Sequence, residues 1–218
     1  MIPNHDLEIA PETLSLFASM PLDAREGLLR KTLTHSVAAG TVLFEQGELP
    51  TFQHVVLSGS AHLFGRSHEG REVLIEIVRP GDLVIPAAVV SQAPYLMQAR
   101  VLEPSRFLLI EGDAFRAALA EEPALAQAMI DSLASQFRRM VGQIKNLKLR
   151  SAPQRVASYI VGLSRRQQAP VRVVLPYEKN LIASELGMTR ESFSRTLSAM
   201  QRDGISVQGD VIVIVNRR

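Results

Sequence analysis

Short apolar runs alternate with polar turn residues between positions 40 and 110. The runs lie in "TVLFEQGE", "QHVVLSGSAHLFGRS", "REVLIEIVRPGDLV" and "ARVLEPSRFLLIEG", and turn residues gather around Gly70 and Gly81. Regularly spaced short strands with turns between them are typical of an antiparallel β-barrel or sandwich. The preceding segment, residues 11–32, has helical periodicity and is predicted to cover one end of this β-domain.

A pattern of apolar residues with helical spacing begins after Pro123. Apolar residues recur at spacings of 4, 3, 4, 3, 4 and 3, namely Ala126, Ile130, Leu133, Phe137, Met140, Ile144 and Leu147. Such an a/d seam predicts one long helix packed on a partner helix. A long core helix lying on its own β-domain would explain part of the pattern. The charged residues Arg138, Arg139 and Lys145 leave only a narrow apolar stripe, which favours a parallel homodimer. Its predicted interface is Ile130, Leu133, Phe137, Met140, Ile144 and Leu147.

The C-terminal part has the pattern of a winged helix-turn-helix. Ser151 and Gln154 are spaced as a capping box at the start of a helix. A short strand, "APVRVVLPY", and a helix, "EKNLIASEL", precede a tight turn at "GMT" and a second helix that Thr189 would cap. Ala183 and Gly187 have the spacing that lets two helices cross closely. A β-hairpin around Gly209 would form the wing.

The last predicted helix carries two distinct stripes. Arg190, Glu191, Ser194 and Arg195 fall within about 140° of arc, and Phe193, Leu197 and Met200 lie on the opposite side. An ordinary solvated amphipathic helix would show the same periodicity. Charge separates the two interpretations: residues 1–137 hold 9 Lys/Arg against 17 Asp/Glu, whereas residues 138–218 hold 15 against 5. A basic C-terminal part is what a ligand with a phosphate backbone selects.

Composition and missing motifs exclude several classes of protein and several kinds of site. The chain has no cysteine, which excludes disulfides, thiolate zinc sites and a cysteine-ligated iron–sulfur cluster. No apolar run has the length of a membrane span, and the N-terminus lacks the pattern of a signal peptide. We therefore expect a cytoplasmic protein without a membrane partner. No nucleophile-elbow, Walker or zincin pattern is present, so an enzyme is not expected.

The polar stripe has the chemistry of base recognition. Arginine can donate twice to guanine and glutamate can accept from cytosine, so Arg190, Glu191 and Arg195 suit the major groove of double-stranded DNA, with Ser194 short enough for close approach. Thr189, Ser192, Lys179 and Arg202 suit the DNA backbone, where contacts position without specifying. A dimer would present two such helices roughly 34 Å apart, to a pseudo-palindromic site.

These motifs together resemble the CRP/FNR superfamily of bacterial transcription regulators over essentially the whole chain. "VLFEQGELPTFQHVVLSG" keeps the glycine spacing of a cyclic-nucleotide-binding domain through Gly47 and Gly59, and "TRESFSR" matches the recognition-helix motif. The resemblance implies an α+β fold: a β-roll sensor over residues 1–122, a dimerisation helix over 123–150 and a winged helix-turn-helix over 151–218. It implies a hinge at residues 149–152 and, for an activator, RNA polymerase as a partner.

The recognition motif satisfies two branches of the superfamily at once. Arg190, Glu191 and Arg195 match the cAMP-receptor branch, and Glu191, Ser194 and Arg195 match the E-x-x-S-R of the FNR branch. The DNA half-site therefore stays open between TGTGA-like and TTGAT-like, with a shared TG core.

The sensor departs from the cAMP-binding members. Tyr95 and Leu96 stand where those members have an arginine and a hydroxyl for the cyclic phosphate, and Asp82 is the only acid near the preceding glycine. No cAMP is expected. Arg100, further along, is interpreted as a surface or interface residue.

The segments "QIKNLKLRSAPQRVASYI" and "LPYEKNLIASELGMTRESFSR" are most similar to NnrR/DNR-type regulators, which respond to nitric oxide and for which haem has been proposed as the receptor. That resemblance makes His5, His54 and His62 candidate haem ligands, although no pair of histidines has diagnostic metal spacing. The alternative function is a cyclic-nucleotide-binding-like module that regulates a protein partner, and such a module has no need of "GMTRESFSR".

Overall fold

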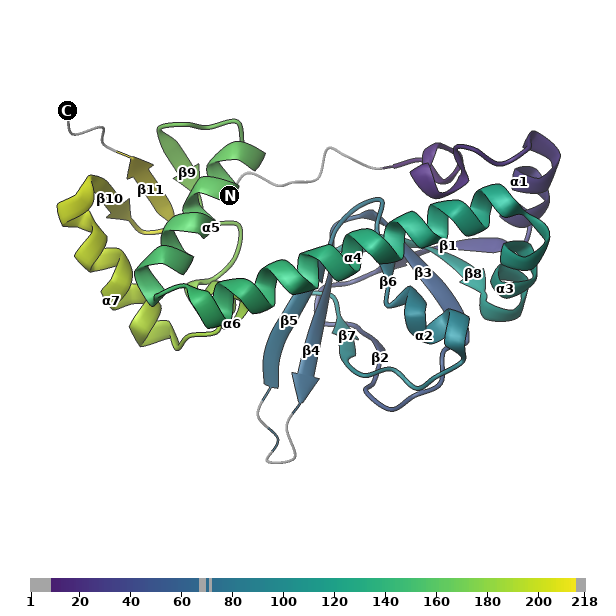
Figure 1. Ribbon diagram of the computed structural model, residues 1–218, viewed down its shortest axis with the longest axis horizontal. Helices are drawn as coiled ribbons and strands as arrows, with labels where there is room; N and C mark the ends of the chain where they lie inside the picture. The colour runs from purple at the N-terminus through teal and green to yellow at the C-terminus, as the bar shows by residue number, and fades with distance from the viewer. Residues whose placement is uncertain (1–8, 67–69, 71, 215–218) are drawn as a thin grey trace. The chain divides into compact units, whose positions relative to one another are not determined.

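The computed structural model describes residues 9–66, 70 and 72–214, and it divides into two compact units at Arg138/Arg139 (Figure 1). The elements of the first unit are, in chain order, η1 (Pro11–Thr13), η2 (Ser15–Phe17), α1 (Leu22–Leu29), β1 (Thr32–Val37), β2 (Val42–Phe44), β3 (Phe52–Ser58), β4 (Ala61–Arg66), β5 (Glu72–Val78), β6 (Leu83–Val84), α2 (Pro86–Ser91), β7 (Gln98–Arg100), β8 (Ser105–Glu111) and α3 (Gly112–Glu121). The long helix α4 (Pro123–Leu149) begins in this unit and continues into the second.

The strands form two antiparallel sheets of four strands each. One has the order β1-β8-β3-β6 and the other β2-β7-β4-β5. Among the described strands, only β4 and β5 are neighbours both in the chain and in a sheet, and elsewhere the chain crosses between the two sheets. Side chains alternate along β3: Val55 and Leu57 belong to one hydrophobic cluster, and Val56 belongs to another. The two faces of β3 therefore contribute to two different cores, as the period of two predicts.

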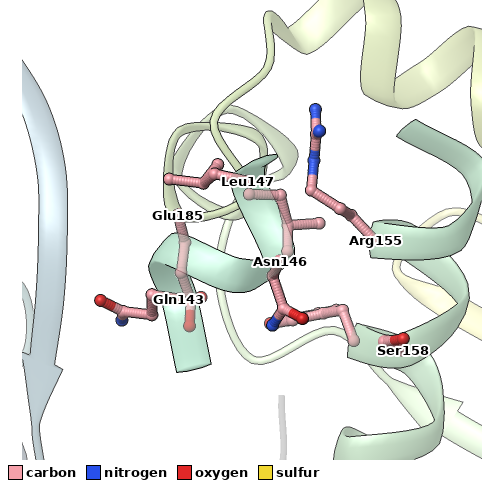
Figure 2. A pocket seen from close by; sticks show the side chains of 8 residues that line it. Gln143, Asn146, Leu147, Arg155, Ser158 and Glu185 are labelled. Atoms are coloured by element: carbon pink, nitrogen blue, oxygen red, sulfur yellow. The ribbon is translucent and has the colours of Figure 1, made fainter. Parts of the chain in front are cut away.

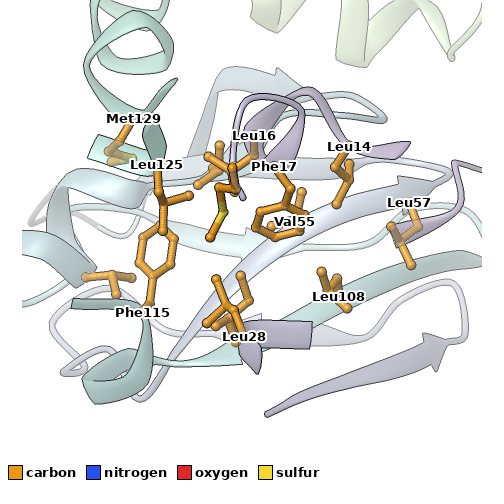
Figure 3. Close-up of a cluster of buried hydrophobic side chains, with 14 residues drawn as sticks. Leu14, Leu16, Phe17, Leu28, Val55, Leu57, Leu108, Phe115, Leu125 and Met129 are labelled. Atoms are coloured by element: carbon orange, nitrogen blue, oxygen red, sulfur yellow. The ribbon is translucent and has the colours of Figure 1, made fainter. Parts of the chain in front are cut away.

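The first core lies between the β1-β8-β3-β6 sheet and the helices (Figure 3). Phe17 from η2, Phe115 from α3 and Leu125 from α4 are fully buried against Val55 and other side chains of the sheet. The N-terminal part of α4 is therefore part of the core of the sensor unit.

The second core fills the interior of the β-roll. Phe44, Val56, Tyr95 and Phe107 are buried there together with smaller side chains from both sheets. The turn between β3 and β4 depends on Gly59, whose φ is +73° and whose missing Cβ would lie 2.1 Å from Ser105 Oγ. Only glycine fits such a contact, which explains one of the two glycines of the sensor motif.

The second unit is a winged helix. Its elements after α4 are α5 (Ala152–Arg166), β9 (Arg172–Val174), α6 (Lys179–Glu185), α7 (Arg190–Met200), η3 (Gln201–Asp203), β10 (Ile205–Gln208) and β11 (Val211–Ile214). The strands form a sheet of order β10-β11-β9, and one core joins the sheet to α5, α6 and α7. The predicted capping box of Ser151 and Gln154 is present at the start of α5.

The predicted fold class is confirmed: a β-roll, a long helix and a C-terminal winged helix-turn-helix. Part of the long helix packs on its own β-domain, as one of the two interpretations expected. Leu125 and Met129 of α4 are buried in the first core, whereas most of the predicted seam is exposed. Within the described residues, no helix combines the length and hydropathy required to cross a membrane.

Candidate nucleic-acid interface

The turn between α6 and α7 has the geometry that the sequence spacing predicted. Ala183 is fully buried, and its carbonyl accepts a hydrogen bond from the Met188 backbone N–H at 3.0 Å. Gly187 has a φ of +62°, a conformation that side chains with a Cβ rarely adopt. A small buried residue and a left-handed glycine thus set the crossing of the two helices.

The two faces of α7 are separated by burial. Phe193 and Leu197 are buried in the core of the winged helix, and Met200 packs against it. Arg190, Glu191 and Arg195 are exposed, and Ser194 is half-buried. The helix is therefore fixed along its apolar side, and two guanidinium groups and a carboxylate point outward from the other side.

Thr189 organises the start of α7. Its hydroxyl accepts the Ser192 backbone N–H at 3.2 Å, which is an N-cap. Hydrogen bonds from the backbone N–H of Glu191 and from the Thr189 side chain lower the pKa of the Glu191 carboxyl, and Arg190 and Arg195 lower it further. The carboxylate is therefore held ionised and oriented, as an acceptor for a base amino group must be.

The residues predicted to contact phosphate surround this face. Lys179 is the first residue of α6, Ser192 lies in the first turn of α7, and Arg202 lies in η3 just beyond α7. Lys179 and Ser192 are half-buried, and Arg202 is exposed. Their spread over three elements is compatible with contacts to a backbone that passes across α7.

Ser198 also lies on the outward face, although the sequence analysis did not select it. Its side chain is exposed and its hydroxyl donates to the Ser194 carbonyl at 3.0 Å. The helical spacing of four residues from Ser194 could have found it. A serine by itself does not indicate DNA binding, because serine hydroxyls are common on exposed helices.

The predicted dimer seam runs along α4. Ile130, Phe137, Met140, Ile144 and Leu147 are between 46% and 64% exposed in the single chain. Leu133 differs, because it is half-buried and packs against the first core. Among the described residues, these large apolar side chains form a row on one helix and stay about half exposed or more.

The sequence resemblance places Tyr95 where cAMP-binding members have an arginine for the cyclic phosphate. Tyr95 is 3% exposed and stacks on Phe44, with ring centroids 3.6 Å apart. Its hydroxyl donates to the Phe52 carbonyl at 3.4 Å, and burial raises its pKa to about 12. Arg100 is occupied elsewhere: its guanidinium lies over the Phe64 ring and donates to Glu72 at 3.4 Å.

His54 and His62 are enclosed by core side chains and leave no space for haem. His54 has its ring 5.6 Å from that of Phe44 and 6.2 Å from that of Phe107, and His62 has no exposed surface. Burial lowers the pKa of both imidazoles to about 4, so they are neutral, as ligation requires. A porphyrin would have to displace the surrounding core, however. His5 lies outside the described residues, within which no group of three or more potential ligands could hold a metal ion.

Comparison with known proteins supports both units. The sequence matches the cyclic nucleotide-binding domain family over residues 34–122 and the Crp-like helix-turn-helix domain family over residues 154–218. It is 31% identical to the anaerobic regulatory protein of Haemophilus influenzae over 179 residues, which cover 79% of this chain and 69% of that protein. It is 25% identical to the CRP-like cAMP-activated global transcriptional regulator of Mycobacterium tuberculosis over 180 residues, 80% of each chain.

A solved structure shows the same fold. The structure of FixK2 from Bradyrhizobium japonicum aligns with a TM-score of 0.73 and 21% identity, and the alignment covers 85% of this chain and 93% of that one. Of these two curated relatives, the first is named as a regulatory protein and the second as a transcriptional regulator. The exposed stripe of α7 and the two matched families lead to the same conclusion: the chain belongs to the CRP/FNR family of DNA-binding transcription regulators.

Proposed function

We propose that this regulator acts as a homodimer that reads a pseudo-palindromic DNA site with TG-core half-sites, in response to a signal other than a cyclic nucleotide. The observation that carries the proposal is the outward stripe of α7, in which Arg190, Glu191 and Arg195 are exposed on a helix whose opposite side is buried. This arrangement presents base-reading groups on a fixed support.

The exposed seam of α4 supports the dimer. Phe137 is 64% exposed and Met140 is 55% exposed, on a helix whose other apolar side is already buried in its own chain. Fully burying one side chain of this size contributes about 1.5 to 3 kcal/mol to stability. In a symmetric pair of helices, each seam position would be buried in both protomers. A second copy of the same helix matches the heptad spacing.

The packing of Tyr95 supports a signal other than a cyclic nucleotide. A cyclic phosphate would meet a buried phenol stacked on Phe44 where it needs a cation, and Arg100 is bound to Glu72. The relatives give no common signal, because one is named as anaerobic and another as cAMP-activated.

On the basis of the sequence resemblance, we propose nitric oxide as the signal and haem as its receptor. His54 and His62 are not proposed as the haem ligands. The test is titration of the whole chain with haem, with and without nitric oxide. A shifted Soret band accompanied by a changed affinity for the DNA site would support the proposal. No shift would remove it.

Selection of bound sequences from random double-stranded DNA tests the proposed DNA site. We expect two inverted half-sites with a TG core, and the flanking bases will decide between the TGTGA-like and TTGAT-like forms. Recovery of sequences without an inverted repeat would contradict the proposal. For an activator, RNA polymerase is the further partner that we propose, and a transcription assay on the selected site tests it.

A further inference from the structure

Leu147, near the end of α4, lies directly against the turn of the helix-turn-helix. A Cβ added at Gly187 would be 2.4 Å from Leu147 Cδ2 and 3.8 Å from its Cγ. The leucine methyl therefore fills the space that any other residue at the turn would need. The contact lies within the second compact unit, which contains the last turns of α4.

The connection between α4 and α5 is closed by several hydrogen bonds. Arg150 Nη1 donates to Ser158 Oγ, and Arg155 Nη1 donates to the Arg150 carbonyl at 3.1 Å. The Ser151 backbone N–H donates to Gln154 Oε1 at 3.0 Å within the capping box. These bonds oppose free rotation at residues 149–152, where the sequence predicted a hinge. The end of α4 and the start of α5 are thus linked by hydrogen bonds.

A small cavity lies beside Leu147, between α4, α5 and α6 (Figure 2). Its volume is about 160 Å³, and its lining is mixed: Gln143 and Asn146 come from α4, Arg155 and Ser158 from α5, and Glu185 from α6. A cavity of this size with several polar groups in its wall can hold water. The end of α4 therefore meets α6 across an incompletely packed gap, and Leu147 and Leu186 are the aliphatic side chains in its wall.

We propose that Leu147 is a positioning residue that sets the place of the α6–α7 turn, and thereby of α7, relative to the long helix. Leu147 is also 48% exposed, so the side chain belongs both to the predicted dimer seam and to the contact with Gly187. A shift of the seam would move this leucine and the turn together. The inference rests on the proposed function, in which α7 reads base edges.

The first experiment compares Leu147→Ala with Ile144→Ala in the full chain. Both residues belong to the predicted seam and have aliphatic side chains of the same size. Their exposed fractions are also similar, 48% for Leu147 and 46% for Ile144, so we expect both truncations to weaken the dimer to a similar extent. Binding to the selected site and to random duplex is measured at chain concentrations where sedimentation shows the dimer. Leu147→Ala should lower the ratio of specific to random affinity by about fivefold or more, and Ile144→Ala should change it less than about twofold.

Leu147→Met keeps a long apolar side chain and should retain most of the wild-type ratio. Equal ratios for Leu147→Ala and Ile144→Ala would overturn the inference while leaving the proposed function intact. A wild-type chain that does not distinguish the selected site from random duplex would instead contradict the proposed function.

A double-mutant cycle with Gly187→Ala tests the contact itself. The left-handed conformation of residue 187 strains alanine equally in both backgrounds, but the clash with Leu147 exists only where the leucine is present. Gly187→Ala should therefore reduce specific binding more in the wild-type background than in Leu147→Ala. Additive losses would overturn the proposed contact. If Gly187→Ala does not fold alone but folds together with Leu147→Ala, that rescue supports the contact.

Discussion

In the proposed function, individual side chains of α7 and α6 have different roles in DNA binding. Arg195 is exposed on the base-reading stripe, whereas Lys179 lies at the start of α6. We expect Arg195→Ala to cost roughly 1 to 3 kcal/mol and to relax selectivity at one base pair. Lys179→Ala should weaken all sequences alike and reduce the salt dependence by about one phosphate contact. Quantitative binding to the selected site and to its single-base variants measures both, and equal loss on every duplex for Arg195→Ala would refute its assigned role.

Thr189 gives a test of how the recognition helix is held. Its hydroxyl caps α7 through the Ser192 N–H and also reaches the Glu191 carboxylate. Thr189→Ala should destabilise the chain by about 0.5 to 2 kcal/mol, as measured by urea unfolding. Thr189→Ser keeps the hydroxyl and is the matched control. Equal stability of the alanine and serine variants would show that the cap is unimportant.

His62 makes folding stability depend on pH. Burial, and then the charges of Arg79 and Arg100, lower its pKa from 6.5 to about 4. Between these two pH values the unfolded chain binds a proton that the folded chain does not. Stability is therefore present above about pH 6.5 and is lost as the pH falls toward 4, by about 1.4 kcal/mol per pH unit for one proton.

The control for this pH dependence is His62→Gln, which lacks the titrating group. Urea unfolding between pH 4.5 and 7.5 should show a slope for the variant that is smaller by roughly one proton. Unchanged slopes would mean that His62 titrates normally in the folded chain.

The helix α4 has two sets of apolar side chains, one buried in its own chain and one exposed. Leu125 and Met129 are buried in the sensor core, whereas Phe137 and Met140 are exposed. We expect Phe137→Glu to place repelling charges opposite each other at the seam and to shift the dimer to monomer, with a parallel loss of DNA affinity. Analytical ultracentrifugation measures the shift. Leu96→Glu, at a 79% exposed leucine of the β-roll, is the control and should remain dimeric.

Local patterns predicted the elements well. Heptad spacing located α4, the Ser151–Gln154 pair located the start of α5, and Thr189 and Gly187 located the turn before α7. These signals depend on residues within a few positions of one another. The stripes of α7 were also readable, because a helix repeats its faces every 3.6 residues.

Contacts between distant segments were not predictable in the same way. The stacking of Tyr95 on Phe44 joins residues 51 positions apart, and the contact of Leu147 with Gly187 joins residues 40 positions apart. The sequence assigned Leu147 to the dimer seam alone, because periodicity along one helix cannot show what a turn elsewhere in the chain will touch.

The whole molecule combines an acidic sensor part with a basic DNA-binding part. Residues 138–218 hold 15 Lys/Arg and 5 Asp/Glu, so the positive charge is concentrated in the part of the chain that contains α7. In the proposed function, this charge attracts DNA of any sequence, and the outward stripe of α7 then selects among sequences. In a dimer, the seam would fix how far apart the two selecting helices lie.

The central claim is that two chains, joined along α4, present their α7 helices to half-sites one helical turn apart. The most direct measurement is the stoichiometry and affinity of binding to the selected site and to a version with about 5 additional base pairs between the half-sites, half a turn of DNA. The account predicts two chains per duplex and a large loss of affinity for the lengthened site. One chain per duplex, with the same affinity at both spacings, would contradict it.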